Sequence, residues 1–221
     1  MSGRPMTDPR EGLPRAQAGA PLQRAKAAMV MLHGRGASAE NILSLADVLA
    51  QPDIAYLAPQ APGHAWYPQS FLAPIEQNEP HLSRALDLVG DLLARLALLG
   101  FPADKVILLG FSQGGCLAAE FAARHPRRYA GVIGLSAGLI GPPGMPRDYA
   151  GSLTGTPVFL GCSDVDPHIP LARVRESTRV LRALGGEVTE RVYPGFGHAI
   201  NDDEIAQVRR IAVAAMAAPP V

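Results

Sequence analysis

The chain has 221 residues, long enough for one sizeable hydrophobic core and ordinary for a single α/β domain. Hydrophobic residues make up 48% of it and charged residues 18%, and 20 basic side chains balance 20 acidic ones. A net charge of zero gives no electrostatic footprint for nucleic acid or an anionic membrane surface, so we expect neither as a partner. The two cysteines, Cys116 and Cys162, match neither a disulfide framework nor a zinc motif, so we expect buried free thiols and no metal.

The N-terminal stretch is rich in Pro and Arg and lacks the apolar segment of a signal peptide. No apolar run in the chain approaches the ~20 residues needed to span a bilayer. We therefore expect a flexible leader over residues 1–18 and one domain over residues 19–221. The same observations predict a cytoplasmic location and no stable membrane insertion.

Strand and helix patterns alternate along the chain. The first half predicts strands at 27–32 and 54–58, helices at 38–50 and 80–99, and a loop rich in Pro, Gly and aromatics at 59–79. The second half predicts strands at 106–109, 130–135, 157–160 and 188–193, and helices at 113–124, 171–184 and 203–217. This order implies a mostly parallel sheet with helices on both faces, whose ligand site lies at the carboxyl ends of the strands.

The pattern Gly-x-Ser-x-Gly occurs twice, around Ser112 and around Ser136. In a nucleophile elbow, a strand precedes the serine and a helix follows it, so that a sharp turn exposes the hydroxyl above the sheet. Ser112 has this context. The run after Ser136 contains Gly141, Pro142 and Pro143 and cannot form a helix, so we interpret Ser136 as a packing residue at a strand end. Ser112 is the predicted nucleophile.

A serine hydroxyl needs a base, and in such folds the order along the chain is serine, acid, histidine. His198 follows the last predicted strand and precedes the last helix, which puts it at the same sheet edge as Ser112. The acid is expected in the loop after the strand ending near Leu160, where Asp164 and Asp166 both stand. We favour Asp166, because it opens a rigid turn into the next helix, and Asp164 is the alternative.

An oxyanion hole needs two backbone N–H groups. One belongs to the residue after the nucleophile, Gln113, and the other comes from a loop after an early strand. The run His33-Gly34-Arg35-Gly36 fits that loop, and its glycines let the backbone turn its amides towards a substrate. We predict the N–H of Arg35 as the second donor and interpret His33 as a structural residue.

Taken together, these motifs resemble the phospholipase/carboxylesterase family of α/β-hydrolases, which includes acyl-protein thioesterases. The resemblance covers roughly residues 19–217. It rests on residues 33–36, on Ala58-Pro59-Gln60 with Trp66-Tyr67 downstream, on residues 110–115, on residues 166–170 and on Gly197-His198. It implies hydrolysis of small-molecule carboxylic esters, thioesters or lysophospholipids without cofactor or metal, by a triad of Ser112, Asp166 and His198. The oligomeric state stays open, with a homodimer as one possibility.

Two further expectations concern the pocket and the competing functions. The gap from Ala137 to Thr156 is too rich in Gly and Pro for a helical lid, so we expect no large lid. We expect Trp66 and Phe71 to form one wall of a shallow apolar groove for short or medium acyl chains, although both could simply pack their loop. An acyltransferase on the same scaffold is the first alternative function, and a non-catalytic binding protein is a less favoured one.

Overall fold

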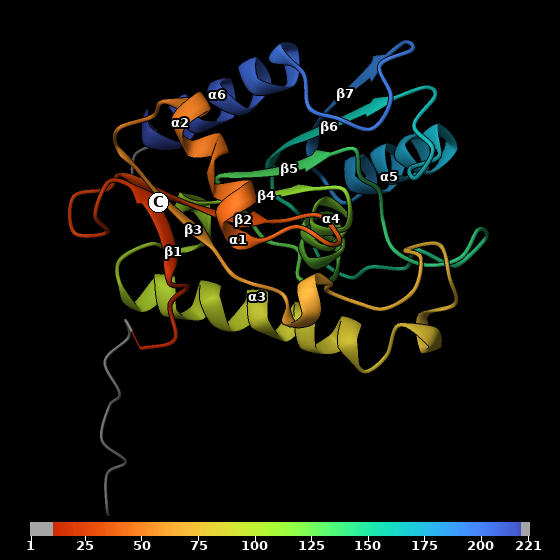
Figure 1. Ribbon diagram of the computed structural model, residues 1–221, viewed down its shortest axis with the longest axis horizontal. Coiled ribbons are helices and arrows are strands. Elements are labelled where there is room, and N and C mark those ends of the chain that lie inside the picture. Colours follow the sequence, from red (N-terminus) through yellow and green to blue (C-terminus); the bar gives the residue numbers. More distant parts are fainter. Residues whose placement is uncertain (1–10, 218–221) are drawn as a thin grey trace, which may run out of the picture.

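The protein is built around one seven-stranded sheet, shown in Figure 1 as a computed structural model that describes residues 11–217. The strand order is β1-β3-β2-β4-β5-β6-β7; β1 runs antiparallel to β3, and all other neighbours are parallel. The strands are β1 (Ala16–Gly19), β2 (Ala27–Leu32), β3 (Ile54–Ala58), β4 (Val106–Phe111), β5 (Gly131–Leu135), β6 (Pro157–Ser163) and β7 (Glu187–Tyr193). The expected mostly parallel sheet is confirmed.

Helices cover both faces of this sheet, as the alternating pattern predicts (Figure 1). They are α1 (Ala39–Leu43), α2 (Leu45–Leu49), α3 (His81–Leu98), α4 (Gln113–Arg124), α5 (Leu171–Ala183) and α6 (Asp202–Ala217). In the described part of the chain, three short 3-10 turns lie at Pro62–His64, Ile75–Gln77 and Ala103–Lys105. The segment from 137 to 156 contains no helix, so the expected absence of a large lid is confirmed.

Alternate side chains of each strand point to opposite faces and build two separate cores. On β2, Met29 and Met31 face α1, α2 and α6, whereas Ala28 and Val30 face α3, α4 and α5. Because both faces are covered, the central strands are apolar throughout, and β2 is buried at every position. This packing fixes the carboxyl ends of β4 and β6, from which the site is built.

The structure corrects the predicted leader, residues 1–18, in its last part. Residues 1–10 lie outside the described part, but Ala16–Gly19 forms the edge strand β1 and pairs with β3 from Ala16↔Ala58 to Gly19↔Ala55. The tetrapeptide Ala-Gln-Ala-Gly has low strand propensity, and only two small alanines lie on its half-buried side. Its strand conformation comes from backbone pairing with β3, which a reading of residue types does not detect.

Two helix boundaries also differ from the sequence pattern. The helix expected over residues 38–50 is divided at Ser44, whose hydroxyl donates to the Asn41 carbonyl at 2.8 Å and so competes with the helical hydrogen bonds. The last helix is capped by Asn201: its Oδ1 accepts from Glu204 N at 3.0 Å, and Glu204 Oε2 accepts from Asn201 N at 3.0 Å. This reciprocal capping box ends the loop that carries His198.

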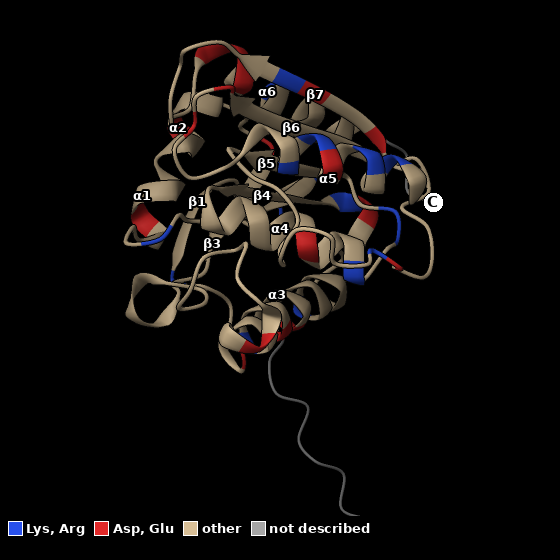
Figure 2. Cartoon of the chain, turned by 90° about the vertical axis from the view of Figure 1, so that its right-hand side faces the viewer, with Lys and Arg blue, Asp and Glu red and all other residues tan. Residues whose placement is uncertain are grey.

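Acidic and basic residues are interspersed along the chain, for example on α5 and β7 in Figure 2. Within residues 11–217, no helix has both the length and the apolar content needed to cross a bilayer.

Candidate active site

Ser112 lies on a strained turn between β4 and α4. Its backbone angles are φ 55° and ψ −120°, a region that residues with a Cβ rarely adopt. The turn closes only because its flanks are glycine. A Cβ on Gly110 would lie 2.3 Å from the Gly114 carbonyl carbon, and a Cβ on Gly114 would lie 2.1 Å from the Leu32 oxygen. The geometry of a nucleophile elbow is therefore present around Ser112.

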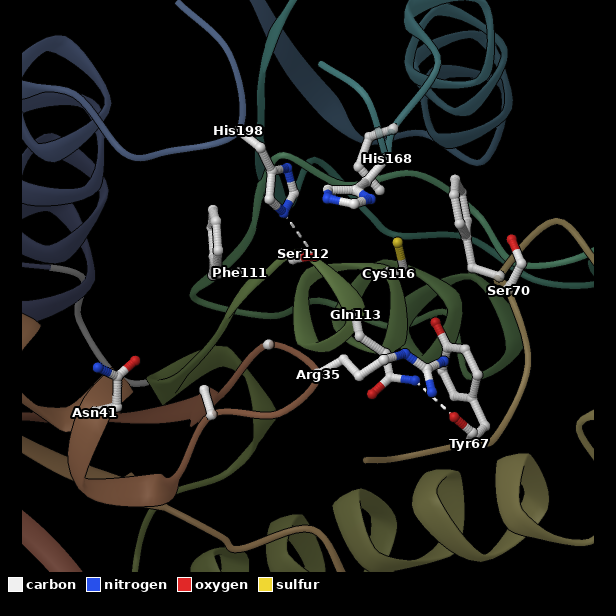
Figure 3. A pocket seen from close by; sticks show the side chains of 14 residues that line it. Arg35, Asn41, Tyr67, Ser70, Phe111, Ser112, Gln113, Cys116, His168 and His198 are labelled. Carbon is white, nitrogen blue, oxygen red and sulfur yellow. Dashed lines mark hydrogen bonds between the residues drawn. The ribbon is translucent and has the colours of Figure 1, made fainter. Parts of the chain in front are cut away.

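The structure brings three of the predicted residues into one hydrogen-bonded chain, and Figure 3 shows its link between Ser112 and His198. Ser112 Oγ lies 2.9 Å from His198 Nε2, and His198 Nδ1 lies 2.7 Å from Asp166 Oδ2. The Asp166 carboxylate can only accept, so Nδ1 carries the proton and Nε2 is free to accept from the serine hydroxyl. The His198 ring is further held by the rings of Phe111 and His168, whose centroids lie 4.9 and 4.8 Å away.

The Asp166 carboxylate is buried and fully hydrogen-bonded. Its Oδ1 accepts from the backbone N–H groups of His168 at 2.8 Å and Ile169 at 3.0 Å. Burial alone raises the pKa of this carboxyl, but the hydrogen bonds from His198 and from the two N–H groups outweigh it and lower the pKa. Asp166 therefore stays ionised beside the imidazole.

The alternative acid, Asp164, has a different set of contacts. Its Oδ1 accepts from the Gly195 N–H at 2.8 Å, in the loop that carries His198. Ser163 Oγ accepts from Gly197 N at 3.0 Å in the same loop. Asp164 thus holds the histidine loop against β6, while Asp166 contacts the imidazole.

The second serine pattern has no such environment. Ser136 is 1% exposed and also has a positive φ of 46°, and its N–H donates to the Gly161 carbonyl at 2.8 Å. It does not line the cavity above Ser112. Its position at the buried end of β5 agrees with a packing role.

The two expected oxyanion donors lie beside the nucleophile, Gln113 as the next residue in the chain and Arg35 in the loop after β2. Arg35 and Gln113 both line the cavity that contains Ser112. Gln113 is the first residue of α4, where a helix has no carbonyl one turn back to accept its N–H. No acceptor for the Arg35 N–H is found among residues 11–217. Both N–H groups are thus available to a bound oxygen.

The His33 side chain packs beneath the loop at residues 33–36 and does not reach the cavity. Its Nε2 accepts from Ala61 N at 3.1 Å, while Nδ1 lies 2.7 Å from the Gly34 carbonyl. Burial lowers the pKa of this ring. A neutral ring with its proton on Nδ1 fits both contacts, so His33 has the structural position that its pattern indicates.

A cavity of about 440 Å³ opens above Ser112, a size common for small-molecule sites. Its lining mixes aromatic and polar groups: Gly34, Arg35, Ala37, Asn41, Tyr67, Ser70, Phe71, Phe111, Ser112, Gln113, Cys116, His168, Ile169 and His198. Phe71 is in this wall, where the sequence analysis expected it. Within residues 11–217, no group of three or more His, Cys, Asp or Glu side chains could hold a metal ion.

The structure corrects the expectation for Trp66. Its side chain is 2% exposed, does not line the cavity, and donates Nε1–H to the His33 carbonyl at 2.8 Å. The neighbouring Tyr67 lines the cavity in its place. An aromatic pair in the sequence does not tell which member faces the site, and here the larger ring packs beneath it.

Sequence reasoning also missed several lining residues. Phe111 and Cys116 stand one residue before and four residues after Ser112, so the elbow itself was a signal for both. We predicted no separate role for His168 from the sequence, yet its ring packs against His198 at the cavity. No pattern in the sequence marked Asn41 or Ser70.

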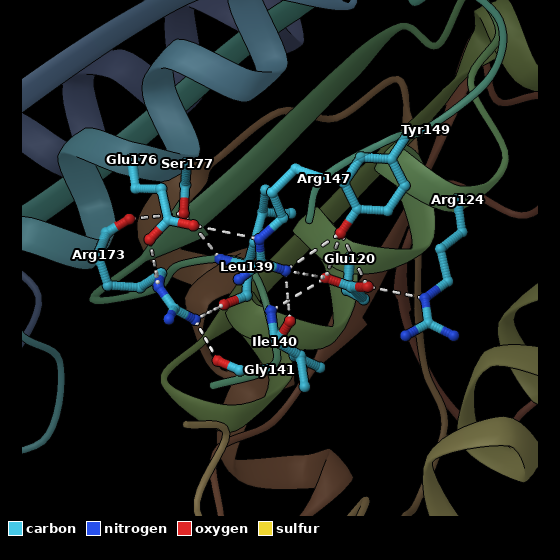
Figure 4. A network of polar contacts seen from close by, with 10 residues as sticks. All are labelled: Glu120, Arg124, Leu139, Ile140, Gly141, Arg147, Tyr149, Arg173, Glu176 and Ser177. Atoms are coloured by element: carbon cyan, nitrogen blue, oxygen red, sulfur yellow. Dashed lines mark hydrogen bonds and ion pairs between the residues drawn. The ribbon is translucent and has the colours of Figure 1, made fainter. Parts of the chain in front are cut away.

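A buried polar network holds the segment after Ser136 against α4 and α5 (Figure 4). Glu120 on α4 accepts from Ile140 N at 2.9 Å and from the Tyr149 hydroxyl at 3.1 Å, and forms an ion pair with Arg124 at 2.7 Å. Arg173 donates to the carbonyls of Leu139 at 2.7 Å and Gly141 at 2.6 Å.

The same segment is tied to the cavity wall. The Gly141 N–H donates to the Phe71 carbonyl at 2.7 Å, so the network reaches the loop that carries Phe71. This wall of the cavity is therefore preformed.

A mostly parallel sheet with a serine on a strained strand-to-helix turn defines an α/β-hydrolase. The family model described as Phospholipase/Carboxylesterase matches residues 15–212, so the chain belongs to the phospholipase/carboxylesterase family. The resemblance identified from the motifs is confirmed.

Individual relatives agree with this assignment. The phospholipase/carboxylesterase structure from Dyadobacter fermentans is 44% identical, with a TM-score of 0.86 over 90% of this chain and 96% of that one. Acyl-protein thioesterase 1 of Eremothecium gossypii is 27% identical over 85% of this chain and 88% of its own length. A partial match to acyl-protein thioesterase 1 of Gibberella zeae, 29% identical, covers 49% of this chain and 47% of that protein. The chain is a hydrolase of the carboxylesterase and thioesterase type.

Proposed function

We propose that this protein hydrolyses small carboxylic esters through an acyl-enzyme formed on Ser112, with His198 as the base and Asp166 as its partner. The observation that carries the proposal is the continuous chain of two hydrogen bonds, 2.9 Å from serine to histidine and 2.7 Å from histidine to aspartate. The order serine, acid, histidine along the chain is that of an α/β-hydrolase triad.

In the first half of the reaction, His198 Nε2 takes the Ser112 proton as Oγ bonds to the ester carbonyl carbon. The carbonyl oxygen becomes an oxyanion, which the N–H groups of Arg35 and Gln113 bind. His198 then gives the proton to the leaving oxygen or sulfur, the bond to the leaving group breaks, and an alcohol or thiol departs. Asp166 stabilises the imidazolium between these two transfers and keeps the required tautomer.

In the second half, a water molecule replaces the leaving group. His198 takes a proton from the water, whose oxygen bonds to the acyl carbon. The tetrahedral intermediate collapses, the bond to Ser112 Oγ breaks, and Oγ regains a proton from His198 as the acid departs. Ser112 and His198 are half-buried rather than sealed, which gives water the access that hydrolysis needs and favours it over acyl transfer.

The cavity indicates the kind of acyl group. Phe71 and Tyr67 supply apolar area, and the wall is held in place by the hydrogen bond between Gly141 and Phe71. We therefore propose short or medium acyl chains, with each buried methylene adding up to ~0.8 kcal/mol until the cavity is filled. Thioesters would react by the same steps, and the acyl-protein thioesterase relatives make a thioester the second substrate class to test.

The experiment compares Ser112→Ala and Ser136→Ala with the unmodified protein on p-nitrophenyl acetate, butyrate and octanoate, a butyryl thioester and a lysophospholipid. We expect Ser112→Ala to abolish hydrolysis and Ser136→Ala to keep most of it. Loss of activity in Ser136→Ala alone would refute the assignment of the nucleophile. Formation of a new ester when an alcohol is added, in preference to the free acid, would favour the acyltransferase.

A further inference from the structure

The side chain of Gln113 binds the loop that follows β3. Its Oε1 accepts from the Trp66 N–H at 3.0 Å, and its Nε2 donates to the Tyr67 carbonyl at 2.8 Å. Gln113 is 6% exposed, so both hydrogen bonds are shielded from water. Gln113, whose own N–H is the proposed oxyanion donor, thus also binds the backbone of two consecutive residues with its side chain.

The side chain of Arg35 binds the next two residues of that loop. Its guanidinium donates to the Pro68 carbonyl at 2.8 Å and to the Gln69 carbonyl at 2.6 Å. It also lies 5.9 Å above the centre of the Tyr67 ring. Figure 3 shows the Arg35 and Gln113 side chains lying side by side and both reaching towards Tyr67.

The Trp66–Gln69 segment is itself anchored at both ends. The Trp66 indole donates to the His33 carbonyl at 2.8 Å, and Gln69 N donates to Asn78 Oδ1 at 2.8 Å. Asn78 is fully buried, stands shortly before α3 in the chain, and also donates to the Ser70 carbonyl at 3.0 Å. The segment is therefore held in one position between the glycine-rich loop at residues 33–36 and the first turn of α4.

We propose that the side chains of Arg35 and Gln113 are positioning residues, which use the Trp66–Gln69 segment to fix the separation of the two oxyanion N–H groups. The inference rests on the proposed function, because it assigns these N–H groups to the oxyanion. Oxyanion donors act only when they stand within hydrogen-bond distance of the developing charge, so small displacements reduce the rate. Backbone hydrogen bonds such as that from Gly36 N to the His64 carbonyl at 2.7 Å hold this loop, and the guanidinium adds the direct link to Pro68 and Gln69.

The test uses Arg35→Met, which keeps the backbone N–H and removes both side-chain hydrogen bonds. The matched control is Arg128→Met. Arg128 is also exposed and donates to two consecutive carbonyls, Thr154 at 2.9 Å and Gly155 at 2.8 Å, away from the cavity. Arg35→Lys is the conservative variant, because an ammonium can keep one of the two hydrogen bonds. Active-site titration gives the concentration of functional enzyme in each preparation, so that kcat is calculated per active molecule.

We expect Arg35→Met to lower kcat on p-nitrophenyl butyrate about 10- to 100-fold, which is part of the loss seen when an oxyanion donor is removed. KM should change less than about threefold, since ground-state contacts stay in place. Arg35→Lys should recover part of the loss, and Arg128→Met should retain the full kcat. Gln113→Glu, which loses the donor to Tyr67, should also lower kcat.

The decisive measurement is the inhibition constant of butyl trifluoromethyl ketone, which mimics the tetrahedral intermediate. Ser112 Oγ adds to its carbonyl carbon, the serine proton moves to His198, and the ketone oxygen becomes an anion in the oxyanion site. We expect its inhibition constant to rise in Arg35→Met by the same factor as kcat/KM falls. An unchanged inhibition constant, an effect confined to KM, or an equal loss in Arg128→Met would overturn the inference. Those outcomes leave the proposed function intact as long as Ser112→Ala is inactive.

Discussion

Glu204 offers a stability test that can be worked out from the structure. It stands in the first turn of α6 and is 1% exposed, and its Oε1 has no hydrogen-bond partner among the described residues. Burial raises the pKa of this carboxyl from 4.5 to about 7, against a smaller lowering by the Asn201 N–H, and the charge of Asp203 adds to the rise.

The size of the effect follows from the difference in proton affinity. A shift from 4.5 to about 7 corresponds to about 3 kcal/mol, at about 1.4 kcal/mol for each unit. Between these two pH values the folded protein binds this proton and the unfolded chain does not. The contribution of Glu204 to the free energy of unfolding should therefore fall by about 3 kcal/mol as pH rises from 4.5 through 7, and stay lower above it. Cys162, whose pKa burial raises to about 12, titrates outside this window.

Urea unfolding of the unmodified protein and of Glu204→Gln at pH 4.5, 6, 7 and 8 measures this effect. The amide does not titrate and keeps an acceptor for the Asn201 N–H. The difference in unfolding free energy between the two proteins should change by about 3 kcal/mol across the series, in favour of the variant at pH 8. Glu76→Gln, at an exposed glutamate, should give curves parallel to the unmodified protein. Parallel curves for Glu204→Gln would refute the reasoning.

Three further predictions concern the site and its supports. Asp166→Asn should lower kcat roughly 10³- to 10⁴-fold by favouring the wrong histidine tautomer. Asp164→Asn keeps an oxygen that can accept from the Gly195 N–H, so its kcat should fall far less. The reverse ranking in steady-state kinetics would reassign the acid. Glu120→Ala should cost about 3–5 kcal/mol in urea unfolding, because a buried ion pair and its hydrogen bonds lose one member, and a cost below about 1 kcal/mol would contradict the role of this network. Phe71→Ala should flatten the dependence of kcat/KM on ester chain length, and no jump in rate should appear when the substrate forms micelles; an unchanged profile or interfacial activation would count against the preformed cavity.

Much of the fold could be predicted from the sequence, because buried parallel strands are continuous apolar runs. The strands at 27–32 and 54–58 and the helix at 113–124 have the bounds that the sequence predicts. Their residues face apolar surroundings on both sides, so local pattern and tertiary environment agree. β1 was missed because backbone pairing, and not side-chain type, makes it a strand.

The site was predictable in so far as chain order and turn chemistry define it. Ser112 and His198 occupy positions that the elbow and the last loop specify. The choice between Asp164 and Asp166 and the orientation of Trp66 depend on where side chains point after folding, which neither spacing nor composition encodes. The binding of the Trp66–Gln69 segment by Arg35 and Gln113 joins residues far apart in the chain and has no signature in the sequence.

The most direct test of the central claim is to label the nucleophile. Diisopropyl fluorophosphate transfers its phosphoryl group to an activated serine oxygen and releases fluoride, and mass spectrometry of peptides locates the modified residue. We predict one added phosphoryl group per chain, on Ser112, with activity lost in proportion to labelling and no label on Ser112→Ala. Label on Ser136, or full activity in a protein fully labelled at Ser112, would contradict the account.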